Sequence, residues 1–261
     1  MDYTFSAKTD PGLIRRNNED AVVLDARQGV AVLADGMGGY NAGEVASGMA
    51  TTLIARELTL CLEAGTAGNP EHDIPRALAT SVDHANQAIL QAARHNPDYK
   101  DMGTTLVAGI FRGDRLFLTH VGDSRCYRLR GGELTQITKD HSVLQEQVDA
   151  GLIPRAAFCA PSSRHILTRA LGVDPELQFE VRIHPVAVGD CYLMCSDGLT
   201  DMVDDASIAS LMGQESNMVK LASALINLAN AKGGRDNIAV ALIHAKDARD
   251  LRGNLSRLFV G

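Results

Sequence analysis

Tight glycine-containing turns between short apolar runs constrain the fold of this chain more than any other feature. Two examples are Phe111–Arg115 and Arg130–Glu133. Connections this short suit antiparallel hairpins, because a parallel crossover needs a dozen or more residues. We therefore expect antiparallel sheets. The predicted strands are Ala21–Leu24, Gly29–Ala34, Thr105–Phe111, Leu116–Val121, Arg125–Arg130, Glu180–Pro185, Asp190–Cys195 and Ile238–His244.

Helical periodicity fills the segments between these strands. The order of elements predicts an α+β fold, a four-layer α/β/β/α sandwich of two antiparallel sheets flanked by helix pairs. Aromatic residues make up only 4% of the chain, so we expect an aliphatic core. We assign residues 1–245 to one domain and residues 246–261 to a C-terminal tail. The predicted helices are Gly43–Ala64, Ile74–Asn96, Ser142–Gly151, Ala206–Met212 and Ser216–Lys232.

Composition narrows the class of protein. Among the 261 residues, 32 are acidic and 25 are Lys or Arg, giving a net charge of −7. Without a basic stripe, a nucleic-acid partner is not expected. The most apolar stretch, Met49–Leu62, contains two charged residues and is too short to span a bilayer, so no membrane association is expected. The polar start and the odd number of cysteines predict a cytoplasmic protein with reduced thiols, and we expect a monomer.

Acidic residues lie at the ends of five predicted strands. Each one alone is explained as a strand stop, because Asp and Asn favour turns. Together they predict carboxylates that converge at one rim of a β-sandwich, where they repel each other unless a cation neutralises them. An oxygen-only ligand set selects Mg²⁺ or Mn²⁺ over Zn²⁺. The residues are Asp20, Asp35, Asp123, Asp197 and Asp236.

A pair of such cations suits the hydrolysis of a phosphate ester, because two metals can activate a bridging water and offset phosphoryl charge. Arg15 and Arg16 precede the first acidic cluster and are placed to bind the phosphate. Gly36 and Gly198 each follow an Asp and would let the backbone approach an ion. An ordinary surface charge remains open as the explanation of the arginines, and for Gly38 and Gly39 a tight strand-to-helix turn is at least as well supported.

Eight short motifs, in order along the chain, resemble one family. They are similar to the bacterial branch of the PPM, or protein phosphatase 2C-like, metal-dependent serine/threonine phosphatases. One such motif alone would be weak evidence, but eight in register cover nearly the whole chain. The resemblance implies the same α/β/β/α sandwich. The motifs are Arg15–Asp20, Ala34–Gly39, Gly103–Thr105, Val121–Arg125, Asp140–Ser142, Leu167–Gly172, Cys195–Asp201 and Gly234–Asn237.

The resemblance implies a binding site for two metal ions, Mn²⁺ or Mg²⁺. Asp35 would bridge both ions, and Gly36 would contribute its carbonyl oxygen. Asp197 and Asp236 would bind one of the two ions. Their positions at separate strand ends fit the rim predicted from the residues alone.

Further roles are implied by the same resemblance. Asp20 and Glu19 would act on the second ion, largely through coordinated waters. Asp123, with Asp197, would hold a third and weaker metal, and Arg15 would bind the phosphate. Residues 142–165 resemble the mobile flap that influences substrate access in the family.

Met37 departs from the animal enzymes, where a histidine at this place has been assigned as the general acid. Methionine cannot donate a proton, so we expect a water on the metal to protonate the leaving group. The bacterial branch shares this methionine, so the change does not indicate a dead enzyme. His141 is an alternative donor, although a structural role is favoured for it.

The sequence thus predicts a phosphatase that hydrolyses phosphoserine and phosphothreonine in phosphorylated proteins and counters a cytosolic Ser/Thr kinase. The alternative is a non-catalytic pseudophosphatase that binds phosphoproteins. An enzyme of the same fold aimed at a different phosphate is a third possibility. Metal-stimulated hydrolysis of a simple aryl phosphate separates the catalytic hypotheses from the non-catalytic one.

Overall fold

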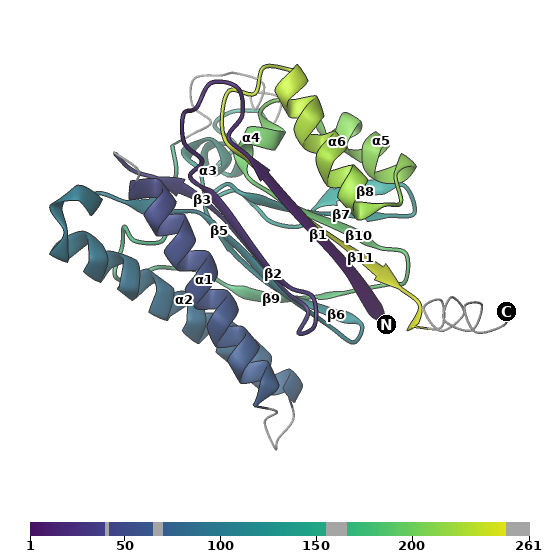
Figure 1. Cartoon of the computed structure of the whole chain (residues 1–261), viewed down its shortest axis with the longest axis horizontal. Coiled ribbons are helices and arrows are strands. Elements are labelled where there is room, and N and C mark those ends of the chain that lie inside the picture. Colours follow the sequence, from purple (N-terminus) through teal and green to yellow (C-terminus); the bar gives the residue numbers. More distant parts are fainter. Residues whose placement is uncertain (40–41, 65–69, 155–165, 249–261) are drawn as a thin grey trace, which may run out of the picture.

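Two antiparallel sheets form the centre of the protein (Figure 1). The computed structural model describes residues 1–39, 42–64, 70–154 and 166–248. Sheet A has the strand order β1 (Asp2–Asp10), β11 (Ile238–Lys246), β10 (Cys191–Cys195), β7 (Arg125–Arg130) and β8 (Glu133–Gln136). Sheet B has the order β2 (Asp20–Asp25), β3 (Val30–Met37), β5 (Leu106–Arg112), β6 (Arg115–Val121) and β9 (Val181–Pro185), with β4 (Gly103–Thr104) paired to β3.

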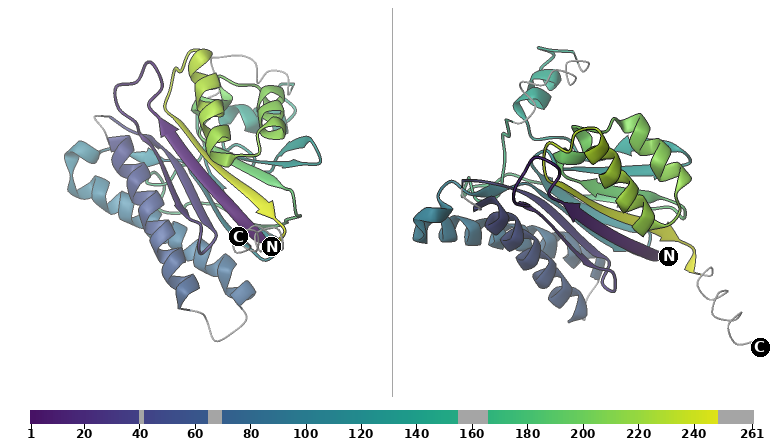
Figure 2. Two further views of the ribbon diagram at one scale, coloured as in Figure 1. Left: turned by 45° about the vertical axis from the view of Figure 1, so that its right-hand side comes forward. Right: turned by 45° about the horizontal axis from the view of Figure 1, so that its top comes forward.

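Helices cover the outer faces of both sheets (Figures 1 and 2). On sheet B lie α1 (Ala42–Glu63) and α2 (Pro70–His95), followed by the 3₁₀ turn η1 (Pro97–Tyr99). On sheet A lie α4 (Asp197–Thr200), α5 (Asp205–Gln214) and α6 (Met218–Ala231). The predicted α/β/β/α sandwich is therefore confirmed. One helix, α3 (Val143–Asp149), stands away from the sheets in the right-hand view of Figure 2.

The layer between the sheets is mainly aliphatic, as expected, but it also contains a group of aromatic side chains. Tyr3 and Phe5 from β1 pack with Phe111 from β5 and Tyr192 from β10, and the Phe111 and Tyr192 ring centroids are 5.2 Å apart. Aliphatic side chains do fill the two helix–sheet layers. Aromatic rings thus help to fill the wide spacing between the two sheets, while Phe117 and Tyr127 are buried in the helix–sheet layers.

Strand β1 was missed by the sequence analysis, which treated the start of the chain only as polar. Tyr3, Phe5 and Ala7 alternate with polar residues and pack against the inter-sheet core, as expected of a half-buried strand. On the other face, Lys8 Nζ donates a hydrogen bond to Ser223 Oγ of α6 at 3.2 Å. The period of two was present in the sequence but was not recognised.

Several predicted boundaries also shift. Strand β3 continues past Ala34 to Met37, because β4 pairs with its last residues, and α2 begins at Pro70 rather than Ile74. The sequence analysis missed β4, β8 and α4. Residues 249–261 of the predicted tail and 155–165 of the predicted flap lie outside the described residues.

Helix α1 is longer than the apolar stretch expected from the sequence. Its 22 residues are long and apolar enough, by length and composition alone, to cross a membrane. However, Ala46, Ala50, Ile54 and Leu58 are buried and pack in one cluster with residues of β3 and β5. Burial of this face against sheet B accounts for the apolar character of the helix.

We expect Ile54→Ala to destabilise the fold by about 2–5 kcal/mol, because it leaves a cavity between α1 and sheet B where Ile54 is 0% exposed. Leu60→Ala on the same helix is the matched control: Leu60 is 55% exposed, and its removal should change stability by less than about 0.5 kcal/mol. Urea unfolding measures both. Equal effects of the two substitutions would contradict the assigned packing of α1.

Candidate active site

The register between β2 and β3 sets the first pair of carboxylates. Asp20 lies directly opposite Asp35, so the two side chains share one end of sheet B. Asp20 is the first residue of its strand, and Asp35 lies within β3. The Asp35 backbone is fixed by Thr105, whose N–H donates to the Asp35 carbonyl at 2.8 Å and whose Oγ1 accepts from the Asp35 N–H at 3.0 Å.

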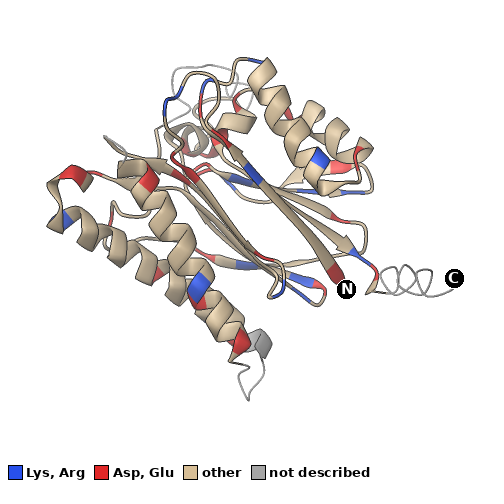
Figure 3. Cartoon of the chain, in the orientation of Figure 1, with Lys and Arg blue, Asp and Glu red and all other residues tan. Residues whose placement is uncertain are grey.

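Sheet A contributes two further carboxylates at the same end of the sandwich. Asp197 is the first residue of α4, directly after β10, and Asp236 precedes β11. Ser196 joins this group to sheet B, because its Oγ donates to Asp20 Oδ2 at 2.6 Å while accepting from the Ala239 N–H at 2.9 Å. Figure 3 shows acidic segments gathered at this end.

Glycines allow the close backbone contacts on which the site depends. A Cβ at Gly36 would come within 2.0 Å of the Gly43 carbonyl oxygen at the start of α1. A Cβ at Gly198 would come within 1.9 Å of the Asn237 carbonyl oxygen. Both glycines are therefore needed for close contacts between segments of the protein, and their approach to an ion stays a prediction.

Asn237 organises the site and was not predicted as a site residue. Its Oδ1 accepts from the Glu19 N–H at 2.8 Å, and its Nδ2 donates to the carbonyls of Pro11 and Asn17. It therefore ties the loop before β2 to the start of β11. The only signal in the sequence was its place in the motif Gly234–Asn237.

Asp123 follows β6 after Gly122, whose φ of +95° lies in the left-handed region that favours glycine. On its other side, Ser124 Oγ lies 2.7 Å from Thr105 Oγ1. Since Thr105 also holds Asp35, one threonine links the two acidic segments.

A cavity of about 830 Å³ collects the predicted site residues. All of them line it except Arg16, which is not among the lining residues, and Asp20, which is buried behind the lining at 7% exposure. Met37, Leu167, Met202 and Arg235 also contribute to the wall. The cavity is therefore lined by several carboxylates together with apolar side chains and two arginines.

Arg15 is held at this cavity by the loop before β2. The Leu13 N–H donates to the Gly234 carbonyl at 2.7 Å, and Arg15 Nη2 donates to Asp236 Oδ2 at 2.6 Å. Arg125, which follows Asp123 by two residues in the sequence, binds Asp140 instead, with its Nη2 2.7 Å from Asp140 Oδ2. Arg15 and Arg235 are thus the arginines at the cavity among the described residues.

The crowded carboxylates resist ionisation. Burial, with the charge of Asp197 adding to it, raises the pKa of Asp20 to about 7, although the Ser196 hydrogen bond acts in the opposite direction. Burial and the charge of Asp197 raise the pKa of Asp123 to about 8. Burial and the charge of Asp20 raise the pKa of Asp35 well above its usual range. A cation at the rim would relieve this repulsion.

The donor set fits a hard divalent cation. Asp20 Oδ1 is buried and has no hydrogen-bond partner among the described residues. Buried polar atoms normally have a partner, so an ion on this side of Asp20 would satisfy it. Within the described ranges, no three His, Cys, Asp or Glu side chains already stand close enough to hold a metal ion. The backbone of the site is therefore in place, and its carboxylate side chains would have to move closer together to bind an ion.

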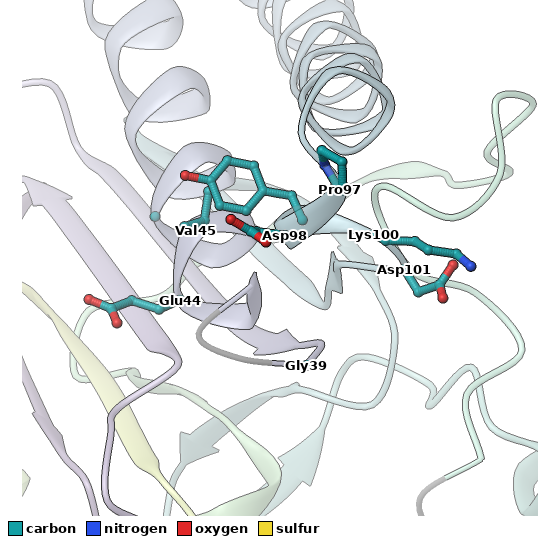
Figure 4. A pocket seen from close by; sticks show the side chains of 9 residues that line it. Gly39, Glu44, Val45, Pro97, Asp98, Lys100 and Asp101 are labelled. Carbon is teal, nitrogen blue, oxygen red and sulfur yellow. The ribbon is translucent and has the colours of Figure 1, made fainter.

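A second hollow, of about 980 Å³, is shown in Figure 4. Gly38 lines the first and Gly39 the second, so the turn after β3 separates them. Glu44 from α1 and Asp98 and Asp101 beyond α2 line it, with Lys100 as its one cation among the described lining residues. It is the larger of the two hollows, but it lacks the converging strand ends and the arginines of the first.

The protein phosphatase 2C family matches residues 15–242 of this chain. The chain belongs to this family. Its resemblance to the bacterial branch is supported by named relatives, and its fold and ordered motifs agree with the match.

Two curated relatives are named serine/threonine phosphatases. The chain is 42% identical over 244 residues to PstP of Mycobacterium tuberculosis, covering 93% of this chain and 45% of PstP. It is 36% identical over 242 residues to Stp of Listeria innocua, covering 90% of this chain and 93% of Stp. The chain thus spans about half the length of PstP and nearly all of Stp.

Solved structures give the same result. The crystal structure of M. tuberculosis PstP/Ppp superposes with a TM-score of 0.86 at 39% identity, covering 95% of this chain and all of that one. The catalytic domain of PstP in complex with two manganese ions superposes with a TM-score of 0.81 at 40% identity, covering 94% and 99%.

Without metal, this protein should lose stability as the pH rises from about 4 to about 8. The folded pKa values of Asp20 and Asp123 lie above the ordinary 3.8, so the folded state holds protons that the unfolded state releases across that window. Asp123→Asn should therefore raise Tm at pH 8 by about 2–8 °C in chelator. Differential scanning fluorimetry at pH 5 and pH 8 measures this.

The control is Asp114→Asn, which removes the same charge from a side chain that is 80% exposed in the β5–β6 turn. It should leave the Tm nearly unchanged at both pH values. A chelator-treated wild type whose Tm does not fall between pH 5 and pH 8 would contradict the assigned repulsion.

Proposed function

We propose that this protein hydrolyses phosphoserine and phosphothreonine esters in proteins, using two Mn²⁺ or Mg²⁺ ions. The observation that carries the proposal is the convergence of Asp35, Asp123, Asp197 and Asp236 on one cavity, with the unpartnered Oδ1 of Asp20 behind it. The names of its relatives support the same activity.

The residues at the cavity have different proposed roles in binding the ions. Asp35, Asp197 and Asp236 would hold the ions together with the Gly36 carbonyl. Glu19 at the cavity wall and Asp20 behind it would act on the second ion, largely through coordinated waters. Asp123, with Asp197, would hold a third, weaker ion. Bound divalent ions would supply an activated water and offset the charge on the phosphoryl oxygens.

Arg15 is the residue best placed to bind the phosphoryl group. In the structure its guanidinium lies against Asp236, and 53% of its side chain is exposed. An ion at Asp236 would compete for the same carboxylate oxygen, which leaves the guanidinium available for a phosphate dianion. Met37 also lines the cavity, and its side chain has no proton to donate to the leaving group.

The setting of this activity is also proposed. A phosphatase of this specificity opposes a serine/threonine kinase, and we place it in the cytoplasm as a monomer. Its substrates are the phosphorylated proteins that such a kinase produces. A phosphoproteome comparison between cells with and without the gene identifies them by the sites that gain phosphate in its absence.

Asp35→Asn should abolish hydrolysis of a phosphothreonine peptide, with a loss of more than about 100-fold in kcat/KM. Outer-shell partners of a metal contribute up to about that factor, and Asp35 is placed to touch the ions. The assay uses purified protein with Mn²⁺, and circular dichroism checks the fold. Asp114→Asn, with the same charge change far from the rim, should retain full activity.

Two outcomes would overturn the proposal. Near-wild-type turnover by Asp35→Asn would show that Asp35 does not hold the ions. A wild type that binds phosphopeptides yet fails to hydrolyse them, or an aryl phosphate, with Mn²⁺ would favour the non-catalytic alternative.

A further inference from the structure

His141 lies outside the catalytic cavity but is bonded to one of its acidic turns. Its backbone N–H donates to the Gly122 carbonyl at 2.9 Å. The Gly122 N–H in turn donates to His141 Nδ1 at 3.2 Å. Backbone and ring of one residue therefore hold both polar groups of the residue that precedes Asp123.

The Gly122 turn that His141 holds is also restricted on its other side by Thr105. A Cβ at Gly122 would come within 2.7 Å of Thr105 Cγ2, so the turn is packed directly on the threonine that fixes Asp35. Ser124, on the far side of Asp123, is hydrogen-bonded to the same threonine. The direction of the Asp123 carboxylate thus depends on two supports, His141 on one side and Thr105 on the other.

His141 also forms the base of the flap. Its carbonyl accepts from the Thr168 N–H at 2.9 Å, and the next residue, Ser142, pairs with Leu167. Ser142 Oγ caps α3 by accepting from the Gln145 N–H at 3.2 Å. Because Leu167 lines the catalytic cavity, His141 connects the Asp123 turn with the segments on either side of the predicted flap.

The ring is placed to accept a hydrogen bond. Its face stacks on His120, with centroids 4.6 Å apart and planes at 20°, and both rings line a separate cavity of about 230 Å³. Since Nδ1 accepts from Gly122, the hydrogen-bond network assigns the proton to Nε2. Burial, with His120 and two arginines nearby, lowers the pKa of His141 to about 4, which keeps the ring neutral.

We propose that His141 is a positioning residue, whose Nδ1 holds the Gly122 N–H and thereby fixes both the Asp123 carboxylate and the base of the flap. This inference rests on the proposed function, in which Asp123 helps to hold an ion. It also argues against His141 as the general acid, because its Nδ1 accepts the Gly122 N–H and its ring lines a different cavity.

The test compares three substitutions that differ in where they place an acceptor. His141→Asn puts its Oδ1 near the position of Nδ1, His141→Gln puts its oxygen near Nε2, and His141→Ala has none. Amide exchange of Gly122 is followed by NMR in chelator-treated protein, so this readout needs no metal and no activity. The Mn²⁺ concentration for half-maximal hydrolysis is measured in parallel.

We expect His141→Ala and His141→Gln to speed Gly122 amide exchange by about fivefold to tenfold, because each variant loses the hydrogen bond to the Gly122 N–H. Their half-maximal Mn²⁺ concentration should rise by a similar factor. His141→Asn should stay within about twofold of wild type in both measurements. The control His184→Gln changes a histidine of the same 230 Å³ cavity and should leave Gly122 exchange unaltered.

Equal impairment of the Asn and Gln variants, or Gly122 exchange that no substitution changes, would overturn the proposal. A lower Tm shared by all three with an unchanged Mn²⁺ dependence would reduce His141 to a structural residue and would also overturn it. If the wild type shows no Mn²⁺-dependent hydrolysis, the proposed function fails, whereas Gly122 exchange still decides the role of the Nδ1 hydrogen bond.

Discussion

The repulsion between buried carboxylates at one rim is the constraint on which the rest of this structure depends. Asp20 and Asp35 are placed opposite each other by strand register, and Asp197 and Asp236 approach from the second sheet. Such a group is unfavourable by itself, as the raised pKa values of Asp20 and Asp35 indicate. The fold tolerates it because the surrounding backbone is held by neutral groups.

Those neutral groups span the two sheets. Ser196 joins Asp20 to β11, Asn237 joins the loop before β2 to the same strand, and Thr105 supports Asp35 and the Asp123 turn. None of them carries charge. Thr105 and Asn237 bind backbone groups, and Ser196 donates to the Asp20 carboxylate itself, so the site is held without a neutralising cation. The arrangement leaves the charge of the rim available to an external cation.

The sequence predicted the layered fold and the acidic residues, but not how they are supported. Short runs and tight turns indicated antiparallel strands, and the motifs identified Asp35, Asp197 and Asp236. Strand register and cross-sheet hydrogen bonds join residues far apart in the chain, such as Ser196 with Asp20, and local periodicity contains no signal for them. Strand β1 was missed for another reason, since its alternation is built on aromatic residues within a polar segment.

Calorimetric titration of the chelator-treated protein with Mn²⁺ near pH 6.5, repeated in buffers of different ionisation enthalpy, tests the central claim most directly. It counts the ions bound and the protons released at once. If cations replace protons at the carboxylate rim, about two ions should bind tightly, with release of at least about one proton per chain. Failure to bind Mn²⁺, or tight binding with no proton release, would contradict the account.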